Sequence, residues 1–204
     1  MKHKAVAFFW TLPVPWAGFT RLPKEIEEAA RVSRTIRFQR CLIQDYVRRH
    51  GSELVHEQAF LEINPDRGSD TIRDALNRAA VICRENGATL IFVDFAAVQG
   101  WRSHEPMMDW LKDADVDSLP IEAVPVMMDG ELFDPHAHFG EWRARQWEWS
   151  AGKEDRRDKA LARARTLKLS GMKYPAIAKT LNAEEVRSLS GRPWTPESLR
   201  KFMS

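Results

Sequence analysis

The segment 89–103, TLIFVDFAAVQGWRS, is where this chain could be expected to do chemistry. Its apolar run predicts a buried strand, and the functional groups of parallel α/β sheets gather at the carboxyl ends of such strands. Asp94 is the one carboxylate near that end, and the turn after it offers Ala96 and Val98, which transfer no proton. Because Asp94 has no partner at a useful spacing, we expect a capping or ion-pair role and not a general base.

Few other residues could hold a metal or attack a substrate. His136 and His138 have no third ligand nearby, which is more typical of a polar turn than of a zinc site. Cys41 and Cys83 lie in expected helices without metal-ligand spacing, which favours reduced, partly buried thiols in a cytoplasmic protein. The sequence has no Gly-rich phosphate loop, and we expect neither a metal nor a cofactor.

Alternating strand and helix patterns predict an α/β fold, with a mostly parallel sheet covered by helices, over residues 1–136. Strands are expected at 4–11, 53–63, 88–95 and 119–126, the last near a sheet edge because prolines interrupt it. Helices are expected at 23–51, 70–87 and 103–114, the third capped by Ser103. Prolines also interrupt the apolar start of the chain, which favours a first strand over a signal peptide, and no run of about 18 apolar residues predicts a membrane span.

The C-terminal quarter is basic. Residues 151–204 carry 13 Lys and Arg against 6 Asp and Glu, whereas the first 150 residues carry 18 against 23. We expect a connecting helix over 137–170, with a boundary or kink at residues 150–152, and a helical module over 171–204. Such a basic module favours contact with a polyanion, although a small helical bundle with a solvated basic face has the same composition.

Three short helices, at roughly 156–169, 174–181 and 196–203, joined by tight turns, fit a helix-turn-helix unit whose last helix enters the major groove of DNA. The candidate DNA-binding residues are Lys173, Lys179, Arg187, Arg192, Trp194, Thr195, Ser198, Arg200 and Lys201.

Residues 171–203, GMKYPAIAKTLNAEEVRSLSGRPWTPESLRKFM, resemble the helix-turn-helix segment of serine recombinases, the family of resolvases, invertases and integrases. The matching positions are Gly171, Ile177, Ala178, Leu181, Asn182, Gly191, Trp194, Thr195, Ser198 and Leu199, with departures at Tyr174 and at Leu189–Ser190. The front of the chain resembles the resolvase catalytic domain more weakly, at Gln39, Arg40, Ile43, Tyr46, Gly51, Phe60 and Glu62. The resemblance therefore implies a resolvase-like α/β domain followed by a DNA-binding module.

The family's catalytic residues do not carry over. Its first strand ends in an R-V-S motif with the nucleophilic serine, where this chain has Trp10–Pro13, and its third strand is followed by arginines, where this chain has Ala96–Val98. Phosphoryl transfer needs such cations around the phosphate, so we expect a catalytically inactive relative. The alternative is an active recombinase with a rearranged site. It would be built from Ser33, Arg31 and Arg102, but the helical pattern of 23–51 runs through Ser33 and favours a chance match.

The resemblance implies double-stranded DNA as a partner and a homodimer, or a higher oligomer, formed through the helix after the sheet. Trp142, Trp147 and Trp149 are the candidate interface. The expected role is that of a regulator or accessory factor in DNA recombination or transcription, beside a recombinase or regulatory protein, in the cytoplasm of a bacterium or encoded by a phage or mobile element. A protein–protein scaffold and a small-molecule sensor at the sheet edge are the other open alternatives.

Overall fold

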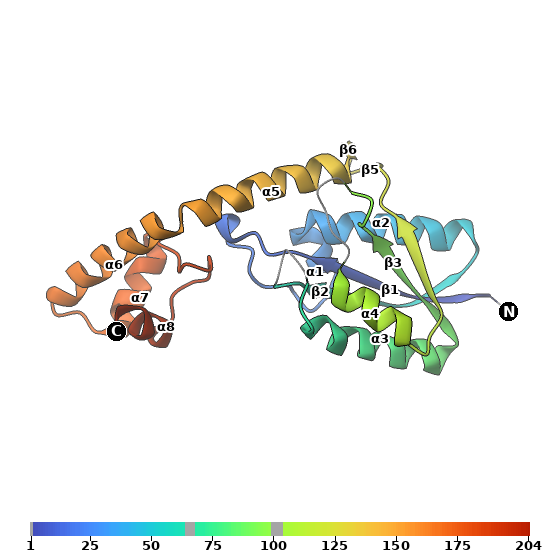
Figure 1. Cartoon of the computed structure of the whole chain (residues 1–204), viewed down its shortest axis with the longest axis horizontal. Coiled ribbons are helices and arrows are strands. Elements are labelled where there is room, and N and C mark those ends of the chain that lie inside the picture. The colour runs from blue at the N-terminus through green and yellow to red at the C-terminus, as the bar shows by residue number, and fades with distance from the viewer. Residues whose placement is uncertain (1, 64–67, 99–103) are drawn as a thin grey trace. The chain divides into compact units, whose positions relative to one another are not determined.

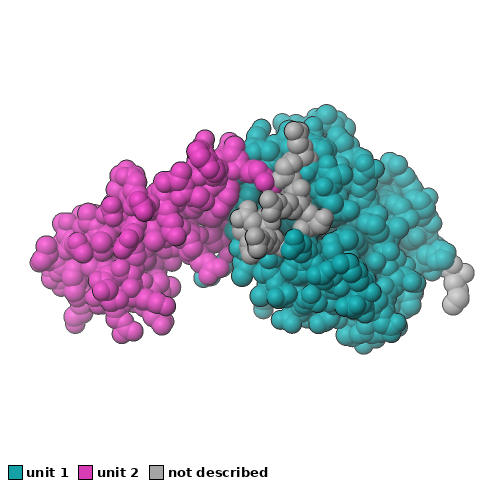
Figure 2. All heavy atoms as spheres, in the orientation of Figure 1, with its two compact units in different colours: residues 1–13, 21–142 teal, residues 14–20, 143–204 magenta. Residues whose placement is uncertain are grey.

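The protein is an α/β chain with C-terminal helices, described by a computed structural model over residues 2–63, 68–98 and 104–204 (Figure 1). It divides into two compact units (Figure 2). The sheet unit comprises residues 1–13 and 21–142, and the helical unit comprises residues 14–20 and 143–204. None of the helices within the described ranges is both long and apolar enough to cross a membrane.

Four parallel strands form the sheet, in the order β2-β1-β3-β4. Their bounds are β1 (Lys4–Thr11), β2 (Glu53–Leu61), β3 (Ala88–Asp94) and β4 (Ser118–Glu122). The two central strands, β1 and β3, are buried over almost their whole length, which explains their apolar runs. The edge position predicted for the fourth strand is confirmed, because β4 pairs with β3 alone among the described strands.

The fourth strand is shorter than predicted, and an antiparallel hairpin of β5 (Val126–Met128) and β6 (Glu131–Phe133) follows it. Asp129 and Gly130 both have positive φ, at 56° and 81°, and form the two-residue turn between them. Asp-Gly is the sequence that such a turn favours, because both residues must adopt the left-handed region. Met128 and Phe133 anchor the hairpin in the core.

Helices cover both faces of the sheet: α1 (Ile26–Val32) and α2 (Arg34–Arg49) one face, α3 (Thr71–Asn86) and α4 (Glu105–Asp113) the other (Figure 1). The single helix expected over 23–51 is wrong, because Ser33 adopts an extended conformation, with φ −120° and ψ 110°, between α1 and α2. The Ser33 Oγ accepts the Ile36 amide at 3.3 Å and caps α2. The helix over 70–87 is confirmed to within one residue at each end, with Gly87 at φ 59° after α3.

The expected cap of α4, Ser103, lies outside the described residues. His104 occupies the cap position, and its Nδ1 accepts the Met107 amide at 3.3 Å.

The helical unit contains α6 (Lys153–Leu169), α7 (Tyr174–Ala183) and α8 (Pro196–Met203), and α5 (Pro135–Ala151) leads into it. Gly152 separates α5 from α6, within the stretch where a boundary or kink was expected. The core of the helical unit is formed by Ala160, Ala164, Leu167, Ile177, Ala178, Leu181, Trp194 and Leu199. Because α6 supplies three of these side chains, it packs as the first helix of the helical unit.

Candidate nucleic-acid interface

Aromatic rings fill the carboxyl edge of the sheet. Trp10 at the end of β1 meets Phe95 edge-on, with ring centroids 5.5 Å apart, and Phe139 of α5 contacts Phe95 at 4.9 Å. Asp94 accepts the amide of Ala96 at 2.8 Å, which is the capping role expected for it. The cavity beside Asp94 and Trp10 has a volume of about 10 Å³, which is room for a single water.

A buried hydrogen-bonded pair lies at the same edge. The Nε2 of His104 and the Oε2 of Glu62 are 2.7 Å apart, and their side chains are 4% and 1% exposed. The Ser69 amide also donates to that Glu62 oxygen, at 3.0 Å. The pair ties the end of β2 to the start of α4. Glu62 was noted only as a family match, and His104 has no local signal that could have linked it to a residue 42 positions away.

Two residues of the rearranged recombinase site, Ser33 and Arg31, lie in different environments. Ser33 is 6% exposed, and its hydroxyl donates to the Thr11 Oγ1 at the end of β1, at 3.1 Å, while it caps α2. The Arg31 side chain is 74% exposed and pairs with Glu28 at 3.5 Å. Arg102 lies outside the described residues. The break at Ser33 therefore places a hydroxyl next to β1, but in a structural role.

Replacing Ser33 with alanine tests that role. We expect Ser33→Ala to lower the free energy of unfolding by about 1 kcal/mol, because α2 loses its cap, and to leave the chain without any DNA adduct, like the parent. Urea unfolding measures the first effect, and a denaturing gel of protein incubated with supercoiled DNA measures the second. A covalent adduct formed by the parent and abolished in Ser33→Ala would identify Ser33 as a nucleophile.

The histidines and cysteines are placed separately. The described residues contain no group of three side chains that could hold a metal ion. His138 lies against Phe133 and Phe139 and shares a hydrogen bond of 3.2 Å with the Thr35 hydroxyl. Burial lowers the pKa of His138, and the nearby Arg34 lowers it further. Burial also raises the pKa of Cys83 to about 11, which keeps the thiol protonated at neutral pH.

A depressed pKa makes His138 a source of acid sensitivity. Its neutral form is favoured by folding, so the stability contribution is complete above the unfolded pKa of about 6.5 and is lost as the pH falls toward the lower folded pKa. We expect His138→Phe to flatten the dependence of Tm on pH below about 6.5, measured by thermal unfolding. The same substitution at exposed His136 should leave the slope as it is in the parent. Parallel curves for the parent and His138→Phe would contradict this assignment.

Trp194, one of the candidate DNA-binding residues, is a core residue of the helical unit and is 5% exposed. Its backbone N–H donates to the Asn182 Oδ1 at 2.7 Å, and its carbonyl accepts the Asn182 Nδ2 at 2.9 Å. The indole N–H donates to the Val186 carbonyl at 2.7 Å. These bonds hold the segment 184–195 between α7 and α8. The side chain of Trp194 therefore positions α8 and does not face solvent.

The next two candidates, Thr195 and Ser198, form a capping box at the start of α8. The Thr195 hydroxyl accepts the Ser198 amide at 3.1 Å, and the Ser198 hydroxyl accepts the Thr195 amide at 2.9 Å. Both residues are exposed. Reciprocal capping fixes the first turn of α8 before any partner binds.

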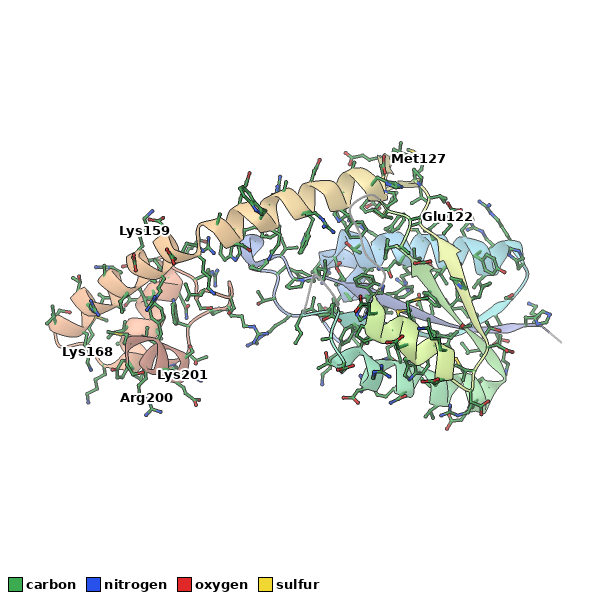
Figure 3. The ribbon with its side chains drawn as sticks, viewed as in Figure 1. Glu122, Met127, Lys159, Lys168, Arg200 and Lys201 are labelled. Carbon is green, nitrogen blue, oxygen red and sulfur yellow. The ribbon has the colours of Figure 1, made fainter. Side chains whose placement is uncertain are left out.

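Six candidate residues are cations that lie at or near the surface and form no ion pair with any described residue. They are Lys173, Lys179, Arg187, Arg192, Arg200 and Lys201. Two other cations of the helical unit form ion pairs: Lys159 with Asp155, at 2.8 Å, and Arg163 with Glu184. Figure 3 shows Arg200 and Lys201 together on α8, away from Lys159 on α6.

A closed turn carries two of these cations. The Ser188 amide donates to the Arg192 carbonyl at 3.0 Å, and the Gly191 amide donates to the Ser188 carbonyl at 2.9 Å. Gly191 has φ 76°, and a Cβ there would lie 2.6 Å from the Pro15 carbonyl oxygen. Only glycine fits this close approach, which packs the turn against the segment 14–20 of the same unit. Arg187 and Arg192 therefore extend from a preorganised turn.

The three tryptophans of the candidate interface have separate environments. Trp142 packs on the core of the sheet unit and donates to the Pro13 carbonyl at 3.3 Å. The Trp149 ring stacks under the Arg156 guanidinium, 3.6 Å from it. Trp147 is 74% exposed. Of the three, Trp147 offers a large apolar surface to a partner.

These observations define an α/β sheet unit with aromatic rings at its carboxyl edge, and a helical unit with six surface cations that form no ion pair with a described residue. Comparison with known proteins gave no matching family model, no similar curated protein and no similar solved structure.

Proposed function

We propose that the chain is a double-stranded DNA-binding protein, with α7 and α8 as its helix-turn-helix. The observation that carries the proposal is the set of six cations without ion pairs on and around α7 and α8, in a unit where Lys159 and Arg163 are ion-paired. An unpaired surface cation gives up no internal contact when it binds a phosphate, and the release of condensed counterions drives such binding.

The amphipathic character of α8 supports its assignment as the recognition helix. Leu199 is fully buried in the core of the helical unit, whereas Arg200 and Lys201 are exposed. A helix anchored from behind, with cations on its outer face, has the form that enters a major groove. Lys179 on α7 and the arginines of the 187–192 turn would contact the flanking phosphates.

We propose a non-catalytic, resolvase-like role in assembly for the sheet unit. Aromatic side chains occupy the edge where a phosphate and its arginines would have to sit. A homodimer formed through α5, with Trp147 in the interface, would place two copies of α8 on an inverted repeat and raise affinity through effective concentration. Such a protein would act on the nucleoid as a regulator or accessory factor of recombination or transcription.

The test uses the full chain with a library of random duplexes at low salt. Retarded DNA on a native gel, without an adduct on a denaturing gel, supports a non-catalytic DNA-binding protein. Absence of binding removes the proposal, and a salt-insensitive complex with another protein would favour a scaffold. A covalent adduct would support DNA binding but would contradict the non-catalytic role.

A further inference from the structure

We propose that Glu197 reads a base: its carboxylate accepts the N4 amino hydrogen of a cytosine in the major groove. The inference rests on the proposed DNA binding by α8. It adds a specificity-determining residue of opposite charge to the basic surface and names the base that this residue selects.

Glu197 lies on the outer face of α8. Leu199 is fully buried, and Phe202 and Met203 pack against the core of the helical unit, so these residues define the inner face. Glu197, Arg200 and Lys201 are exposed. Residues three and four positions apart are neighbours on a helix surface, so these side chains share one patch.

The carboxylate of Glu197 has no hydrogen-bond or ion-pair partner among the described residues, although Lys201 stands at the i+4 spacing that most favours such a pair. By contrast, Glu184 of the same unit is paired with Arg163. Glu197 is not needed for capping either, because Ser198 fills the capping-box position.

A carboxylate on this face restricts the DNA groups that it can contact, because the phosphates of DNA repel it. Near the phosphates it only weakens binding, and favourable partners for it are the amino groups of base edges. Cytosine N4 is the donor that Glu and Asp side chains accept from in the major groove. Glu197 is in the first turn of α8, which Pro196 and the capping box hold rigid, and first-turn residues of a recognition helix reach base edges. Arg200, one turn later, suits a guanine O6/N7 edge nearby.

The test compares sequences selected from a random duplex library by the full-length parent, Glu197→Gln and Glu154→Gln. We expect the parent to select cytosine at one position and Glu197→Gln to select adenine there, because glutamine pairs with adenine N6/N7. The preference at that position should change by about tenfold or more. Glu154 is the matched control, since it is the exposed second residue of α6 and loses the same charge. Glu154→Gln should keep the parent's selected site.

Identical selected sites for the parent and Glu197→Gln would overturn the inference and leave DNA binding intact. Failure of the parent to bind DNA would overturn both proposals, so the two failures are distinguishable. Glu197→Asp provides a second variant, which should keep the cytosine preference in weakened form. A preference for another base in Glu197→Asp would also contradict the assignment.

Discussion

Replacing Arg200 and Lys201 together with alanine should weaken DNA binding by at least about tenfold at about 0.1 M salt. It should also reduce the slope of log K against log salt concentration by about 0.9, because Lys201 would lose one phosphate contact at about 0.9, whereas Arg200 would lose a base contact. Both side chains are exposed and unpaired with described residues, so the fold should keep its stability to within about 0.5 kcal/mol. Fluorescence anisotropy over a salt series measures both effects.

Two single variants serve as a matched comparison. Lys201→Ala and Lys159→Ala each remove one positive charge, but Lys159 lies on α6, where it is paired with Asp155. We expect Lys201→Ala to weaken binding and Lys159→Ala to leave the affinity close to that of the parent. Equal losses would mean that net charge, and not the α8 surface, determines binding.

Replacing Trp194 with alanine should lower the free energy of unfolding of the helical unit by about 3–5 kcal/mol. The ring is 5% exposed, lies 4.8 Å from the ring of Phe202 and donates a hydrogen bond to Val186. The small core of this unit has few other large side chains to absorb the cavity. Urea unfolding followed by circular dichroism should show the loss of helix at lower denaturant, and DNA binding should disappear with it.

Leu169→Ala is the control for that experiment. Leu169 is 88% exposed at the end of α6 in the same unit, so its removal should change stability by less than about 0.5 kcal/mol. Similar effects for the two variants would contradict the assignment of Trp194 as the anchor of α8.

The positions of the strands along the chain and of most helices follow from local signals, and the exceptions have local causes. The apolar runs of β1 and β3 and the Gly87 stop of α3 are visible in the sequence because burial and the left-handed region leave characteristic residues. In the sequence, Ser33 fits the helical period like a residue inside a helix. Its hydrogen bonds to the Ile36 amide and to Thr11 are visible only in the three-dimensional structure. The β5–β6 hairpin carries an Asp-Gly turn, but its three-residue strands are too short to show alternation.

The candidate site could be predicted only in part. The basic residues near α8 are apparent from composition and motif, because surface charge is a local property. Trp194 belongs to the same motif but is buried in the core of the helical unit. A motif alone does not distinguish a DNA-contacting residue from a packing residue. The Glu62–His104 pair and the aromatic contacts at the sheet edge join distant segments of the chain, so no local sequence pattern predicts them.

The slope of log K against log salt concentration for the full chain on a random duplex tests the central claim most directly. If five or six of these unpaired cations neutralise phosphates, the slope should lie between about −4.5 and −5.4, at about −0.9 for each phosphate contact. A steep slope within that range would support the basic surface around α8 as the DNA interface. A slope near zero, or the absence of binding at low salt, would contradict it.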